Sequence, residues 1–188
     1  MRQRLQNTST RGSTRATVNL SSSTGTSQLL TRALSSDTYI RNERTHDLLF
    51  RLLGNCPNTD VLVSNKAGTR FAHIQVKTYR PGRDQTVTVG PKAERSNGTS
   101  FFWVLAGIPE ATSNAGWEYY IIPFADFSTI VRENHQRWMA TPGRNGQAHN
   151  DSAVRAVAVP PHTRPYTVHS IEQYHERWDL IIDACVVM

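Results

Sequence analysis

The chain has 188 residues, with 21 Lys and Arg against 15 Asp and Glu, so its formal net charge is +6. This length allows one well-buried core with some chain left over. No stretch resembles a transmembrane span or a secretory leader, and the two cysteines, Cys56 and Cys185, are too few for a disulfide framework. We therefore expect a cytoplasmic protein with free thiols and no membrane partner.

The positive charge is distributed unevenly. Residues 1–36 contain five arginines and fifteen serines and threonines, but no acidic and no aromatic residue. Such a segment cannot bury enough apolar surface to offset the entropy lost on ordering. We expect residues 1–36 to form a flexible basic arm, with a wrongly assigned start codon as the alternative. Residues 37–188 then form a single domain of net charge +1.

The stretch "SSDTYIRNERTHDLLFRLLG" predicts a helix over residues 37–53. Ser36 or Asp37 is suited to the N-cap, and Gly54 is suited to end the helix. The residues that define its apolar stripe are Leu48, Leu49, Leu52 and Leu53.

The next stretch, "CPNTDVLVSNKAGTRFAHIQVKTY", predicts a β-hairpin. Val61 and Val63 share one face over residues 60–65, and Ala72, Ile74 and Val76 share one face over residues 70–79. A turn with Asn65 and Gly68 separates the two runs. This period-two pattern is typical of paired antiparallel strands.

The rest of the chain predicts three further strands, two helices and a short extended piece. The strands are "QTVTVGP", "FFWVLAGI" and "WEYYIIP", of which the second has the continuous apolar pattern of a strand buried on both faces. One helix is predicted around Phe127, Ile130, Val131 and Trp138, then a loop "TPGRNGQAHNDS" and an extended "RAVAVPPHTRP". A last helix is predicted to open at Ser170 and to bury Ile171, Tyr174 and Trp178. This order of elements predicts an α/β or α+β domain.

The predicted hairpin would bring several polar side chains together. Because side chains alternate along a strand, His73, Gln75 and Lys77 share one face. If the hairpin closes near 66–68, Asp60 lies across from the end of the strand that holds Gln75 and Lys77. A carboxylate, an amide and an ammonium group would then converge at one end of a sheet.

"TDVLV" followed by "IQVK" resembles the PD-(D/E)xK nuclease superfamily, whose fold is restriction-endonuclease-like and Holliday-junction-resolvase-like. The resemblance covers residues 37 to about 79. It implies an α/β fold with an αβββαβ core, in which a mixed central sheet is flanked by helices. It also implies Mg²⁺- or Mn²⁺-dependent hydrolysis of DNA. In that family the (D/E)xK position is most often acidic, so Gln75 departs from the pattern and leaves the metal site with one negative charge fewer.

The resemblance assigns roles to individual residues. Asp60, Gln75 and the Val76 carbonyl would bind the metal ion, and Glu43 of the preceding helix would join them. Lys77 would orient the attacking water or neutralise the transition state. A basic run between Lys66 and Arg95 has a local charge of +5. Within it, Arg80, Arg83, Lys92 and Arg95 would contact the phosphate backbone of DNA, and His73, on the same face as Gln75 and Lys77, would contact a phosphate as well.

Each of these residues also has a simpler interpretation. Lys77 can be read as a lysine at the end of a strand whose ammonium group reaches water. Glu43 can be read as a surface glutamate, and His73 as a half-exposed histidine of a strand. Trp138 and Trp178 suit the core, or else the interface of a homodimer that cuts both strands. The histidines show no recurring zinc-ligand spacing.

Two functions follow. The first is a Mg²⁺-dependent DNA endonuclease of restriction or repair. The alternative is a catalytically inactive nuclease-fold protein that binds nucleic acid or a protein partner.

Overall fold

The computed structural model describes residues 56–65, 67–95, 97–110 and 115–186. It also gives the backbone of three short strands, β1 (Ala16–Thr17), β2 (Ile40–Arg41) and β3 (Leu49–Leu52). Apart from β1, the arm predicted over residues 1–36 lies outside the described residues, as does Glu43. β1 and β2 pair with each other in parallel.

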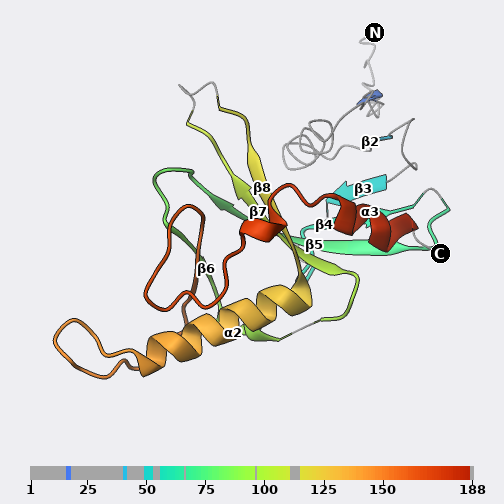
Figure 1. The fold of residues 1–188 in the computed structure, drawn as a ribbon. Helices are drawn as coiled ribbons and strands as arrows, with labels where there is room; N and C mark the ends of the chain where they lie inside the picture. The colour runs from blue at the N-terminus through green and yellow to red at the C-terminus, as the bar shows by residue number, and fades with distance from the viewer. Residues whose placement is uncertain are drawn as a thin grey trace, which may run out of the picture.

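A five-stranded mixed sheet forms the centre of the molecule (Figure 1). Its strand order is β3-β4-β5-β7-β8, where β4 spans Val61–Ser64, β5 Phe71–Tyr79, β7 Phe101–Gly107 and β8 Glu118–Pro123. β4 is antiparallel to both of its neighbours, β5 and β7 are parallel, and β8 is antiparallel to β7. The predicted hairpin and the two later strands are confirmed.

The helix predicted over residues 37–53 is wrong where the chain is described. Ile40–Arg41 and Leu49–Leu52 are strands, and β3 pairs antiparallel with β4, with Leu49 opposite Ser64 and Leu52 opposite Val61. Short apolar runs suit a helix stripe and a strand equally well. Here pairing decides, because β3 supplies hydrogen-bond partners to the edge of β4 that β5 does not cover.

A second, two-stranded sheet joins distant parts of the chain. β6 (Thr86–Val89) pairs antiparallel with β9 (Arg155–Ala158), and Val87 lies opposite Val157. Both strands were predicted as extended segments, but the pairing between them was not. The chain passes from β6 through the 3₁₀ turn η1 (Pro91–Glu94) into β7.

Two α-helices are described. α2 (Phe124–Ala140) confirms the helix predicted around Phe127 and Trp138. The last helix, α3 (Asp179–Val186), begins later than predicted. Ile171 and Trp178 precede it, and Tyr174 lies in the 3₁₀ turn η2 (Glu172–Tyr174). Among the described residues, no helix has the length and apolar character needed to cross a membrane.

Contacts of Glu176 with β8 explain why the chain before α3 is not helical. Glu176 has a φ of 52°, in the left-handed region, and its backbone N–H donates to the Tyr119 carbonyl at 2.8 Å. Its carboxylate accepts from the Tyr119 N–H at 3.0 Å and from Trp178 Nε1 at 2.7 Å. These bonds hold the segment against the strand and prevent a continuous helix from Ser170.

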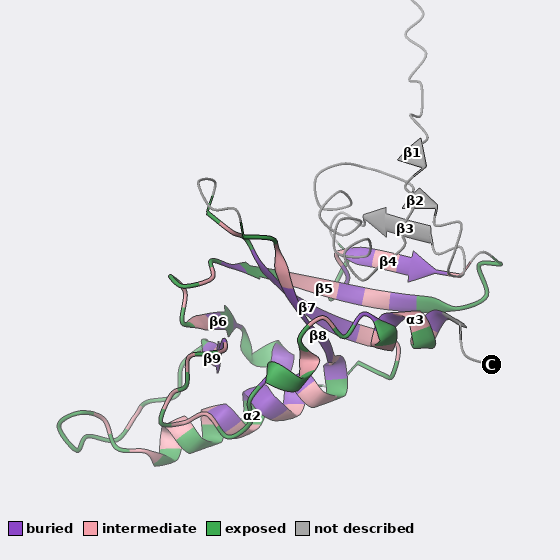
Figure 2. Ribbon diagram, turned by 45° about the horizontal axis from the view of Figure 1, so that its top comes forward, coloured by how far each residue is buried: buried purple, intermediate pink, exposed green. Residues whose placement is uncertain are grey.

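The two α-helices pack on opposite faces of the central sheet. Buried residues of one face contact Trp178, Ile181 and Cys185 at α3, whereas Trp103, Leu105 and Ile122 of the other face contact α2 and the β6–β9 pair. β7 is buried on both faces, as its continuous apolar sequence predicted. Figure 2 shows the buried residues along the inner strands and on the sheet-facing side of α2. The protein is a mixed α/β, single compact domain.

The far ends of β5, β7 and β8 approach closely at Gly107. Tyr79 Oη donates to Glu118 Oε1 at 2.5 Å across this glycine. A β-carbon on Gly107 would lie 2.6 Å from Glu118 Cγ and 2.9 Å from Tyr79 Cζ. Burial and the bond to Glu118 raise the pKa of Tyr79 well above its ordinary value, so its hydroxyl stays protonated.

Candidate functional site

The strand register places Asp60 opposite Gln75. Val61 pairs with Ile74, so the residue before Val61 faces the residue after Ile74 on the same side of the sheet. The Asp60 N–H donates to the Ile74 carbonyl at 2.8 Å and fixes this alignment. The predicted convergence of Asp60 and Gln75 is therefore present.

The Asp60 carboxylate is held by two hydrogen bonds from β5. Gln75 Nε2 donates to Asp60 Oδ2 at 2.5 Å, and the Val76 N–H donates to the same oxygen at 2.7 Å. Bonds to an ionised acceptor are short and strong, so they hold the carboxylate in one orientation. The residues that the structure describes provide no hydrogen bond to Asp60 Oδ1 or Gln75 Oε1.

The Val76 carbonyl points to the same edge of β5. The Ile74 carbonyl accepts from Asp60 on the β4 side, and polar backbone groups two residues apart in a strand point the same way. β4 begins only at Val61, so it does not cover β5 at Val76. Asp60 Oδ1, Gln75 Oε1 and the Val76 carbonyl are thus three oxygen atoms at one edge.

These oxygen atoms are of the type that Mg²⁺ and Mn²⁺ prefer, but only one of the groups is charged. Within the described ranges, no three or more His, Cys, Asp or Glu side chains lie close enough together to hold a metal ion. Glu43, the residue expected to supply a second carboxylate, lies outside the described residues. The donor atoms fit a hard divalent cation bound with most of its water molecules.

Lys77 follows two residues after Gln75 on the same face of β5, and its side chain is exposed. Its register partner on β7 is Leu105, which is fully buried. No acidic side chain of the described residues forms an ion pair with Lys77. Its ammonium group is therefore available to a ligand that approaches this edge.

His73 is held by a ring stack and by a contact at its Nδ1 atom. It stacks on Phe101 with ring centroids 4.3 Å apart, and its Nδ1 lies 3.3 Å from Thr59 Oγ1. Phe101 in turn contacts the edge of Phe124, the first residue of α2. His73 is half-buried and lies on the β5 face that carries Gln75. No sequence pattern indicated the contact with Thr59, a buried residue next to Asp60.

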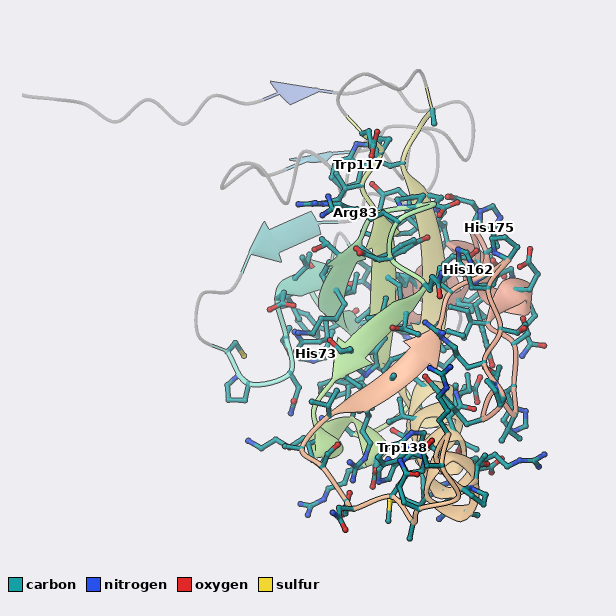
Figure 3. The ribbon with its side chains drawn as sticks, turned by 90° about the vertical axis from the view of Figure 1, so that its left-hand side faces the viewer. His73, Arg83, Trp117, Trp138, His162 and His175 are labelled. Atoms are coloured by element: carbon teal, nitrogen blue, oxygen red, sulfur yellow. The ribbon has the colours of Figure 1, made fainter. Side chains whose placement is uncertain are left out.

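The predicted DNA-contacting residues of the basic run are all exposed but fall into two groups. Arg80 and Arg83 lie in the turn after β5, where the Arg80 N–H donates to Asp84 Oδ2 at 2.8 Å. Lys92 and Arg95 lie at η1, and the chain from there reaches the His73 N–H through the Ser100 carbonyl at 2.8 Å. Figure 3 shows Arg83 well separated from His73.

Both cysteines are free thiols. Cys56 is exposed, and Cys185 is buried with its Sγ 3.9 Å from the Val63 carbonyl. Burial raises the pKa of Cys185 to about 11, so this thiol is protonated near neutral pH.

Comparison of the chain with protein-family models, with curated proteins and with solved structures finds no match.

Proposed function

We propose that the protein is a Mg²⁺- or Mn²⁺-dependent endonuclease that hydrolyses phosphodiester bonds in DNA. The observation that carries the proposal is the Asp60 carboxylate, held against Gln75 and the Val76 N–H with Lys77 on the same face. The resemblance of "TDVLV" and "IQVK" to the PD-(D/E)xK superfamily concerns these same residues.

The arrangement of strands supports a restriction-endonuclease-like core. Three consecutive antiparallel strands, β3, β4 and β5, are followed by a connection to β7, which is parallel to β5. That order matches the βββ and final β elements of an αβββαβ core. The connection here contains β6 and η1 in the place of an α-helix.

The side chains suit the chemistry of phosphodiester hydrolysis. A bound Mg²⁺ would stabilise charge on the phosphate and lower the pKa of a water molecule. Asp60, Gln75 and the Val76 carbonyl would hold the ion, with Asp60 supplying the charge. The exposed Lys77 would orient the water or neutralise the developing negative charge.

The exposed basic residues would hold the DNA. Lys92 and Arg95 lie on the connection that leads to the His73 end of β5, and Arg80 and Arg83 follow its Lys77 end, so the two groups would contact the DNA backbone on either side of the site. Cutting both strands at once would require a homodimer. The cytoplasmic location stays a prediction.

A catalytically inactive nuclease-fold module is the second candidate. It is favoured by the Gln75 amide, which donates to Asp60 where an acidic residue would add a second charge to the metal site. Such a protein would bind DNA or a protein partner through the same exposed surface without cutting.

Plasmid nicking across a Mg²⁺ and Mn²⁺ titration separates the two candidates, with filter binding of DNA in parallel. We expect weak nicking that Asp60→Ala and Lys77→Ala abolish and that Gln75→Glu keeps or raises. Lys77→Ala should lower turnover more than DNA binding. Asp183→Asn, at an exposed carboxylate on α3, is the matched control and should nick like the wild type.

The binding module is supported if neither the wild type nor Gln75→Glu cuts in Mn²⁺ while DNA is still bound. If DNA is not bound either, both nucleic-acid functions are wrong and a protein partner becomes the better hypothesis.

A further inference from the structure

A cavity of about 210 Å³ lies between the second half of α2, the chain entering β9 and the loop around residue 166. Asn134, His135 and Trp138 line it from α2, Val154 and Ala156 from the β9 side, and Tyr166 from the loop. Figure 3 shows Trp138 apart from His73, nearer the lower end of the view. The cavity is therefore separate from the Asp60 site.

The aromatic side chains of the cavity are held in place by their neighbours. Trp138 stacks on His149 with ring centroids 4.1 Å apart and on His135 with centroids 5.5 Å apart. The ring of His135 is fixed by a 2.9 Å hydrogen bond between its Nε2 and Asp151 Oδ1. These contacts give the cavity rigid ring walls before any ligand arrives.

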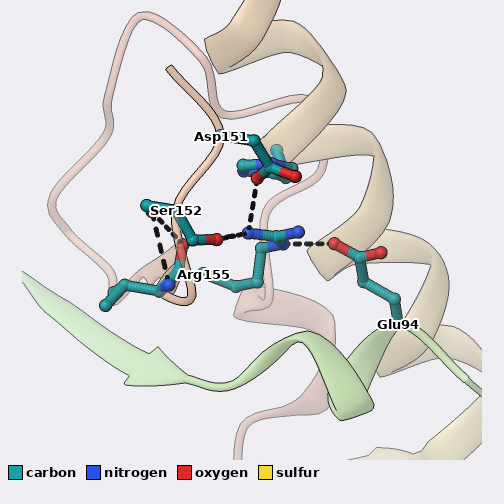
Figure 4. A network of polar contacts seen from close by, with 6 residues as sticks. Glu94, Asp151, Ser152 and Arg155 are labelled. Atoms are coloured by element: carbon teal, nitrogen blue, oxygen red, sulfur yellow. Dashed lines mark hydrogen bonds and ion pairs between the residues drawn. The ribbon is translucent and has the colours of Figure 1, made fainter. Parts of the chain in front are cut away.

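A polar network supports the opposite wall. The buried Arg155 guanidinium contacts Glu94, the Ser152 carbonyl and, at 3.2 Å, Asp151 Oδ1 (Figure 4). This network ties the chain before β9 to η1, and it contains the same carboxylate that orients His135. No sequence pattern indicated it, because Glu94 and Arg155 are 61 residues apart.

Asn134 has a buried amide nitrogen without a partner among the described residues. Its side chain is 1% exposed, and its Oδ1 accepts from the Val168 N–H at 2.8 Å. No acceptor for its Nδ2 is found in the described part of the chain. Buried donors are nearly always paired, and Asn134 lines the cavity, so an acceptor on a ligand there would complete this group once the amide turned toward it.

The size and surroundings of the cavity select a small planar ligand. Pockets for drug-sized ligands span about 300–1,000 Å³, so this cavity suits one ring system. Arg137 and Arg144, both exposed, lie on the last turn of α2 and in the loop after it, where they could contact a phosphate. Val154, which is 54% exposed, leaves an apolar surface at the cavity.

We propose that the cavity binds one unstacked nucleobase, with the ring against Trp138, His135 or Tyr166 and a carbonyl or ring-nitrogen acceptor facing Asn134 Nδ2. Bases taken out of a helix are held by aromatic contacts and by hydrogen bonds to their edges. The choice of a nucleobase rests on the proposed function, because DNA is the source of that base.

The helix α2 relates this cavity to the Asp60 site. Phe124, at its start, contacts Phe101, which stacks on His73. Trp138 lies fourteen residues later, about 21 Å along the helix axis at 1.5 Å per residue. A base in the cavity would belong to a nucleotide several positions from the phosphate at Asp60.

Saturation-transfer NMR of the full chain with the four deoxynucleoside monophosphates tests the proposal, with ribose 5-phosphate as the control that lacks a base. We expect transfer to the base protons and no displacement of the nucleotides by ribose 5-phosphate. Val154→Trp, which fills the cavity from an exposed position, should weaken binding at least tenfold. Ile108→Trp, at another exposed apolar residue, is the matched control and should bind like the wild type.

A second variant tests the amide donor. Asn134→Asp keeps an acceptor for the Val168 N–H and removes the Nδ2 donor, and we expect binding about tenfold weaker. Thermal melting establishes that each variant is folded. Should Asn134→Asp fail to fold, the Val154→Trp and Ile108→Trp pair decides the question alone.

The proposal is overturned if no nucleotide binds, if ribose 5-phosphate competes equally, or if Val154→Trp binds as tightly as Ile108→Trp. These outcomes are distinct from failure of the nuclease proposal, which is a lack of plasmid nicking. A protein that does not nick DNA but binds nucleotides in the cavity would retain this inference.

Discussion

Replacing Gln75 by glutamate tests the geometry of the candidate site directly. In the wild type, Gln75 Nε2 donates to Asp60 Oδ2 at 2.5 Å. Gln75→Glu replaces this donor by a carboxylate oxygen of nearly the same size and position. Two negative charges then lie in contact unless a proton or a cation separates them.

The cost in the absence of metal follows from the two interactions that change. A hydrogen bond to a charged group contributes about 1.5–3 kcal/mol, and this bond is lost. Repulsion between two half-exposed carboxylates adds a smaller term, because solvent screens it. We expect a loss of about 3 kcal/mol in the free energy of unfolding, which lowers Tm by about 6–12 °C in a chain of this size.

The loss should depend on pH in a defined direction. Repulsion between Asp60 and the introduced glutamate raises the folded-state pKa of one of the two carboxyl groups above its unfolded value of about 4. The folded protein then binds an extra proton as the pH falls through that raised pKa. Relative to the wild type, Gln75→Glu should therefore regain stability as the pH falls from 8 toward 5.

Urea unfolding at pH 8 and pH 5, in EDTA and in Mg²⁺, measures both effects. Mg²⁺ should stabilise Gln75→Glu more than the wild type, because a cation that binds only the folded state adds its binding free energy to stability. Gln75→Met is the matched control, because it removes the hydrogen bond without adding charge. It should be destabilised by about 1–3 kcal/mol at both pH values and should respond to Mg²⁺ less than the wild type.

Equal losses for Gln75→Glu and Gln75→Met at both pH values would refute the reasoning, because the two carboxylates would then not be in contact. A pH effect without a Mg²⁺ effect would retain the geometry but argue against a metal site.

Three further experiments test the fold. Gly107→Ala should lower Tm by several degrees, because a β-carbon there would lie 2.6 Å from Glu118 Cγ, and unchanged melting would contradict the close approach. Arg155→Met should lower the free energy of unfolding, measured in urea, by about 3 kcal/mol, because it leaves the Glu94 carboxylate without its partner. Adding Glu94→Gln should recover part of this loss, and a double variant as unstable as the single one would argue against the pair. Cys56 should react with a thiol reagent at pH 8 in the native protein, whereas Cys185 should react only after unfolding because its pKa is raised to about 11, and equal rates would contradict its burial.

The candidate site was predictable from the sequence because it is local. Asp60 and Gln75 lie on the two arms of one hairpin, where period-two alternation and a short turn determine which residues face each other. The same alternation placed His73 and Lys77 on the Gln75 face. The helix α2 was predictable for the same reason, since its apolar stripe recurs at helical spacing.

Only the tertiary structure decided features in which distant segments meet. Leu49–Leu52 pairs with β4 as a strand, although its leucines also suit a helix, because the partner strand satisfies its backbone. Likewise, Glu176 interrupts the last predicted helix by bonding to Tyr119.

The cavity at Asn134 and the Arg155–Glu94 pair are further examples of the same limit. Each depends on side chains brought together from α2, η1 and the chain around β9. Sequence periodicity records which face of an element is apolar, and so it determined the hairpin and its polar face. It does not record which other element covers that face, because that choice depends on packing and hydrogen bonding across the whole domain.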